Sequence, residues 1–152
     1  MKNITLGQGI GILANVGVLA GLLLLAFELS QNREMMQAQT RHDLTQGIVD
    51  QVLILATDEE FSELVARVQS GASDLSEVDS SRYNAFVNAR LRYWEDVHYQ
   101  YRLGLYDESE FSAQMGAWRL FLQSEATQER WRLTRQNYSP EFAAEIDSLL
   151  SD

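Results

Sequence analysis

The chain is poor in the residues that most catalytic sites require. It contains no cysteine, only two histidines, one proline and a single lysine, Lys2. Without cysteine there is no thiol nucleophile, and the cellular compartment stays open because disulfide-free domains occur on either side of a membrane. The sequence also contains no glycine-rich phosphate loop and no nucleophile elbow. It therefore predicts a non-enzymatic protein with no catalytic residue and no cofactor.

Positive charge is also scarce. The chain has 22 acidic and 12 basic residues, a net charge of −10, and only Lys2 and Glu28 of these precede residue 31. Nucleic-acid binding depends on neutralising phosphates with Lys and Arg, so the balance argues against a nucleic-acid partner. It argues equally against a domain lying flat on anionic lipid, and is typical of a soluble acidic domain.

One long apolar run stands at the N-terminus, from Gly9 to Phe27, with Asn15 as its only polar side chain. At about 1.5 Å per residue it spans roughly 28 Å, close to the ~30 Å hydrocarbon layer of a bilayer, so it predicts a single transmembrane helix. A cleaved signal peptide is the alternative, but no small-residue cleavage site follows Phe27 and the run exceeds the usual ~7–15 residues. A buried core helix is a third interpretation, disfavoured by the length of the uncharged run.

The sequence predicts an all-α protein in which this helix continues into a small helical bundle. We expect a transmembrane anchor over residues 1–30, a polar helical neck over 31–43 and an acidic bundle domain over 44–152. Apolar residues return at helical spacing after the neck, at Leu44, Ile48, Val52 and Leu55. We expect that helix to be least stable at Gly47.

Helix signals then recur along the domain. Asp58 begins a helix whose apolar face is Phe61, Leu64, Val65 and Val68, and Gly71 ends it. A long helix follows from about Ser80 to Leu103, ending near Gly104. Three later helices are predicted. The first begins with a capping box from Asp107 to Glu110, and the second is a short helix with Trp131 and Leu133. The third begins at Ser139-Pro140 and has the apolar stripe Phe142, Ile146, Leu149 and Leu150.

Glu95 and His98 share a helix face and resemble half of a metal-binding pair. Di-iron bundles need two such pairs and two further carboxylates, and the other histidine, His42, has no glutamate three residues before it. We therefore predict no metal site and interpret His98 as a structural histidine.

The long helix is dense in aromatic and arginine residues. These define a candidate ligand or partner surface of Arg90, Tyr93, Trp94, His98, Tyr101 and Arg102. The alternative, which we favour, is a central bundle helix whose rings face several neighbours and whose arginines pair with the abundant carboxylates.

A stripe of small residues lies within the apolar run. Gly17 and Gly21 form a GxxxG pair, with Ala14 and Glu28 on the same helical face and Asn15 off it. Small residues allow a second membrane helix to approach closely, and Glu28 would be less costly at such a contact than facing lipid. The stripe predicts packing against a membrane protein partner or a second copy; ordinary glycine content is the alternative.

Three segments resemble an uncharacterised family of short bacterial single-pass membrane proteins: LAFELSQNREMMQAQ (25–39), YWEDVHYQYRLGLYDESEF (93–111) and NYSPEFAAEIDSLL (137–150). The resemblance implies one N-terminal membrane helix with a small helical domain, placed in the bacterial inner membrane with the domain in the cytoplasm. It supplies no activity and no functional residue. Charge does not decide the orientation, because Lys2 is balanced by Arg33 and Arg41.

Two functions of different class follow. The first is a non-enzymatic, membrane-anchored interaction module or accessory subunit of a larger membrane complex. The second is a membrane-tethered sensor that binds a small ligand in the aromatic bundle. A pocket lined by Tyr and Trp with converging Arg would favour the sensor, and a filled core would count against it.

Overall fold

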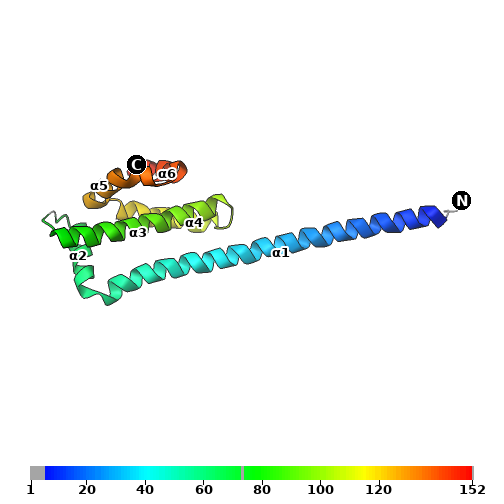
Figure 1. Ribbon diagram of the computed structural model, residues 1–152, viewed down its shortest axis with the longest axis horizontal. Coiled ribbons are helices and arrows are strands. Elements are labelled where there is room, and N and C mark those ends of the chain that lie inside the picture. Colours follow the sequence, from blue (N-terminus) through cyan, green and yellow to red (C-terminus); the bar gives the residue numbers. More distant parts are fainter. Residues whose placement is uncertain (1–5, 73, 152) are drawn as a thin grey trace. The chain divides into compact units, whose positions relative to one another are not determined.

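The computed structural model describes residues 6–72 and 74–151, and its regular structure there is entirely helical (Figure 1). The prediction of an all-α chain, in which a long apolar N-terminal helix continues into a helical bundle, is confirmed. The helices are α1 (Leu6–Thr57), α2 (Glu59–Gln69), α3 (Glu77–Arg102), α4 (Glu108–Phe121), α5 (Glu125–Thr134), the 3₁₀ turn η1 (Arg135–Asn137) and α6 (Pro140–Ser151).

The chain divides into two units, one ending at Gln39 and one beginning at Thr40. The first unit is the N-terminal part of α1, and its large apolar side chains are exposed throughout. By length and composition α1 is the one helix among the described residues able to cross a membrane, and none of its apolar window is buried. The described structure therefore gives no support to the interpretation of this run as a buried core helix.

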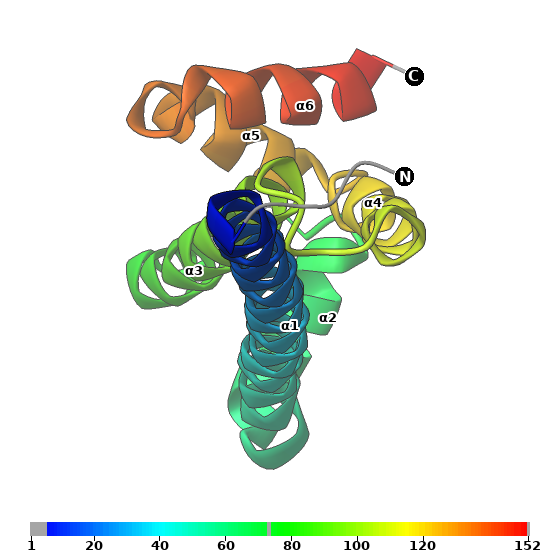
Figure 2. The same cartoon turned by 90° about the vertical axis from the view of Figure 1, so that its right-hand side faces the viewer.

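The second unit is built around α3. Helices α2, α4, α5 and α6 each pack against it, and in Figure 2 α5 and α6 lie as a layer above α3 and α4. Trp94 of α3 stacks on Trp118 of α4 with ring centroids 4.9 Å apart. The edge of Trp118 then meets Phe142 of α6 at 6.3 Å, and Phe142 meets Trp131 of α5 at 6.0 Å. Aromatic packing thus joins helices from all parts of the domain.

The predicted helix ends are confirmed where glycine marks them. Gly71 and Gly104 follow α2 and α3 with φ angles of 95° and 69°, the left-handed region that glycine adopts without steric cost. The start of α3 was predicted too late, at Ser80. The helix begins at Glu77 because the Ser76 hydroxyl accepts a hydrogen bond from the Asp79 amide and caps it three residues earlier.

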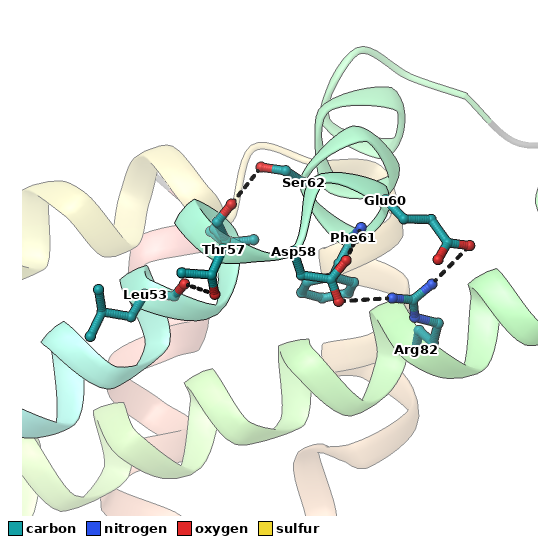
Figure 3. A network of polar contacts seen from close by, with 8 residues as sticks. Leu53, Thr57, Asp58, Glu60, Phe61, Ser62 and Arg82 are labelled. Carbon is teal, nitrogen blue, oxygen red and sulfur yellow. Dashed lines mark hydrogen bonds and ion pairs between the residues drawn. The ribbon is translucent and has the colours of Figure 1, made fainter.

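A polar network fixes the corner between α1 and α2 (Figure 3). One carboxylate oxygen of Asp58 accepts from the Phe61 amide at 2.9 Å, which caps α2 as predicted, and the other accepts from Arg82 of α3 at 3.2 Å. The Ser62 hydroxyl donates to the Leu55 carbonyl at 2.9 Å and so satisfies an end group of α1. The corner therefore ties three helices together.

The C-terminal part of α1 packs on α3 through a narrow face. Leu44 is buried, and its carbonyl accepts a hydrogen bond of 2.8 Å from the Tyr93 hydroxyl. At Gly47 an added Cβ would lie 3.0 Å from the Tyr93 ring. Val52, which the sequence placed with the inward residues, is instead 52% exposed, because the contact with the bundle covers only the side of α1 that carries Leu44 and Gly47.

Three substitutions at two glycines test this contact. Gly116→Ala, in exposed α4 where an added Cβ meets nothing within 4 Å, should raise the free energy of unfolding by about 0.5–1 kcal/mol through helix propensity. Gly47→Ala should gain less, because its methyl group crowds Tyr93, and Gly47→Leu should lose about 1–3 kcal/mol. Urea denaturation of the detergent-solubilised chain measures all three. An equal gain at both alanine positions would show that the Gly47–Tyr93 approach is not tight.

Candidate functional site

The predicted membrane-packing stripe lies on one open helix face. Ala14, Gly17, Gly21 and Glu28 all belong to α1 and are exposed. A Cβ added at Gly17 or at Gly21 would meet no atom within 4 Å. The backbone is therefore accessible at both glycines, which is the geometry that lets a second helix come close.

A shallow surface groove begins where this stripe ends. Its lining includes Glu28, Gln31, Met35 and Ala38, which follow one another along the same face of α1. Met35 is exposed and flexible, a side chain suited to irregular protein contacts. The groove is open to solvent, so it has the form of a contact surface and not of a ligand cavity.

The six residues of the predicted aromatic surface do not form one surface. Trp94 is 2% exposed and stacked on Trp118, and His98 is 6% exposed with its ring 6.1 Å from Phe111 and 5.8 Å from Phe142. These two residues belong to the core and present no binding face. The assignment of Trp94 and His98 to a surface is thus corrected, because five helices surround α3 and take up its rings.

Arg90 and Tyr93 are both engaged by neighbouring side chains or backbone groups, Arg90 by the Phe121 ring of α4 and Tyr93 by α1. The Arg90 guanidinium lies 4.7 Å from the centre of the Phe121 ring, and its burial lowers its pKa. Burial raises the pKa of Tyr93 to about 12, with smaller contributions from Tyr106 and Asp96. The hydroxyl of Tyr93 therefore keeps the proton that it donates to the Leu44 carbonyl. Both side chains have structural roles.

Tyr101 and Arg102 complete the set at the other end of α3. Tyr101 is stacked on Phe111, with ring centroids 4.1 Å apart, and Arg102 pairs with Glu141 at 3.2 Å. Arg102 shares a surface groove with Glu95 and His98, but the Glu95 carboxylate is already engaged by the Ser139 amide at 2.7 Å and Arg92 at 2.6 Å. Although burial opposes it, these hydrogen bonds lower the pKa of Glu95.

Glu95 and His98 do not come together with further ligands. Within residues 6–72 and 74–151 no group of three or more His, Cys, Asp or Glu side chains is placed to hold a metal ion. The core beside them is filled, since Trp94, Trp118 and Trp131 are all nearly inaccessible. This filling counts against a ligand pocket among the Tyr and Trp side chains of α3.

Sequence reasoning missed one feature, the exposed apolar side chains around the last turns of α1. Val49, Val52, Leu53 and Ile54 are 42–52% exposed although they belong to the folded domain. The sequence contained a signal for this feature. Val49, Val52 and Ala56 repeat every 3.5 residues, and this repeat does not include the buried Leu44.

Comparison of the chain with known protein families, with characterised proteins and with solved structures gave no match.

Buried His98 makes stability depend on pH. Burial lowers its pKa below 6.5, with Arg102 acting in the same direction and Glu145, Glu141 and Glu95 opposing. The unfolded chain thus binds the proton more readily, so the free energy of unfolding should fall as the pH drops from about 6.5 toward 5. Glu95 and Asp147, whose pKa values hydrogen bonds lower, stay ionised in that window and lose their contribution only below it.

In His98→Gln this slope should become shallower, whatever the absolute stability of the variant. Urea denaturation at several pH values in that window measures it. A variant with the slope of the unmodified chain would contradict the assignment to His98.

Proposed function

We propose that this protein is a non-enzymatic, membrane-anchored interaction module, an accessory subunit that associates with a membrane protein partner or with itself through its transmembrane helix. The single observation that carries the proposal is the uninterrupted, fully exposed apolar run of α1 with an open small-residue face at Ala14, Gly17 and Gly21. In water such a surface would be unstable, whereas in a bilayer it is the form that a spanning and packing helix takes.

The rest of the chain supports an interaction role. The helical domain has a filled core and an acidic composition, and the Glu95 carboxylate is already hydrogen-bonded, which favours a folded module over an enzyme or a small-ligand sensor. Its charge of −10 favours protein partners over nucleic acid. The sensor remains the second candidate, and the packed Trp94–Trp118 pair argues against it.

The proposed location is the bacterial inner membrane, with the helical domain in the cytoplasm. This placement rests on the resemblance of segments 25–39, 93–111 and 137–150 to short bacterial single-pass proteins. The lysine and arginine balance on the two sides of the apolar run is too even to choose an orientation by itself.

Anchoring is tested by fractionation. The full chain should stay in the membrane pellet after a carbonate wash at its intact mass of 17.3 kDa, because the helix is uncleaved, and residues 31–152 alone should be soluble. Release of the intact chain into the wash would contradict the anchor. A membrane-free chain shortened after about residue 27 would instead show a signal peptide.

The packing face is tested by substitution. Gly17→Ile and Gly21→Ile should each weaken association at least about tenfold, since branched side chains separate the helices and remove the van der Waals contact that drives association in lipid. Gly9→Ile is the matched control, because an added Cβ there is also unobstructed but lies on another side of the helix. Asn15→Leu and neutralisation of Glu28 should have smaller effects.

An in-membrane association assay on the full chain gives self-association, and recovery from native membranes gives the partner. If Gly17→Ile and Gly21→Ile leave both unchanged, the stripe has no packing role.

A further inference from the structure

The last five turns of α1 have two different faces. One face packs on the bundle and carries Leu44, Gly47 and the half-buried Leu55. A second face, which we call the outer stripe, is exposed and consists of His42, Thr45, Val49, Val52 and Ala56. At about 100° per residue its centre lies roughly 120° around the helix from Leu44. The bundle therefore leaves this stripe uncovered.

The outer stripe has the spacing of a coiled coil. Its residues follow one another at intervals of three, four, three and four, which is the alternation of a and d positions in a 3.5-residue repeat. Val49 falls at an a position, where two-stranded coiled coils favour β-branched side chains, and His42 is a polar a residue of the kind that specifies register. A helix that only covered its own bundle would need one apolar face and not two.

We propose that the outer stripe binds the outer stripe of a second copy of this chain, as a parallel two-stranded coiled coil in register. In the sequence, the same spacing continues backward through Ala38, Met35, Gln31, Glu28 and Leu24 and reaches Gly21, Gly17 and Ala14. A second copy is the partner certain to present a matching repeat of the same length and phase. The parallel orientation rests on the proposed membrane anchoring, because both N-terminal helices then enter the bilayer from the same side.

Charge supports this occupant. Two copies of a chain with a net charge of −10 repel each other unless they meet through a face without carboxylates. The outer stripe has none, and the two acidic residues of this part of α1, Asp43 and Asp50, lie away from it. Asp50 accepts a hydrogen bond from Gln46 at 2.7 Å, which keeps it beside its own helix.

Disulfide cross-linking of the full chain in membranes tests the proposal, and the absence of native cysteine removes any background. Val49→Cys and Val52→Cys should each cross-link under mild oxidation to a species of twice the chain mass. Ile54→Cys is the matched control, because Ile54 is as exposed as Val52, 51% against 52%, but lies on another side of α1. The cross-linked fraction at positions 49 and 52 should exceed that at 54 several-fold.

Substitution with charge gives a second readout. Val52→Asp should raise the dimer dissociation constant at least about tenfold, because it buries an unpaired carboxylate opposite its own copy, whereas Ile54→Asp should leave it unchanged. Energy transfer between two labelled copies in detergent solution measures both. Because both positions are half exposed, circular dichroism should show the same helix content in each variant.

Equal cross-linking at all three positions, no cross-link at 49 and 52, or an adduct of any other mass would overturn the proposal. A carbonate wash of the same membranes reports the anchoring separately. If the chain leaves the membrane but the outer stripe still cross-links, the proposed anchor is wrong and the dimer is supported. If the chain stays in the pellet but does not cross-link, the anchor is supported and the dimer is wrong.

Discussion

The stacking of Trp94 on Trp118 organises the helical domain, because it joins the central helix α3 to α4. Phe142 of α6 packs against Trp118, and Trp131 of α5 packs in turn against Phe142. Large rigid rings fill this space with little loss of side-chain freedom and bury much apolar area. Because Trp94, Trp118 and Trp131 occupy the interior beside α3, the packing of the described residues favours interactions through the surface of the domain over ligand binding inside it. The same packing explains why His98 lies among aromatic rings and why burial lowers its pKa.

Local sequence signals predicted most of the fold because capping residues and glycines mark where helices start and end. Asp58 and Asp107 cap the helices that follow them, and Gly71 and Gly104 end helices at positive φ, so these boundaries depend on a few neighbouring residues. The start of α3 was placed too late, at about Ser80, because the cap at Ser76 becomes evident only from the hydrogen bond that its hydroxyl accepts from the Asp79 amide. Such choices depend on energies smaller than sequence patterns resolve.

The candidate sites were harder to predict, since a helical repeat shows which residues share a face but not what covers it. Trp94, His98 and Arg90 looked like a binding surface because rings and arginines alternate along α3, yet neighbouring helices cover them. For Val52 the error was the opposite one, because the sequence placed it with the buried residues and it is exposed. Val52 loosely fits the spacing of Leu44 and Leu55, but a bundle covers only about a third of a helix surface, and Val52 lies outside that sector. Burial depends on tertiary packing. The hydrophobic period of the sequence therefore shows which residues can be buried together, but not which of them are buried.

The two exposed faces of α1 differ in the physics that would bind them. In the apolar segment the surrounding lipid is as apolar as the helix, so association depends on close backbone contact at Gly17 and Gly21. Along the outer stripe water supplies a hydrophobic driving force, so branched apolar side chains such as Val49 and Val52 take the place of glycine. Along α1 the contact residues therefore change from glycine in the apolar segment to branched apolar side chains in the part exposed to water, while the spacing between them stays the same. One helix that keeps its repeat through two solvents is suited to holding two chains together over its whole length, and a partner that matched only the membrane segment would leave Val49 and Val52 in water.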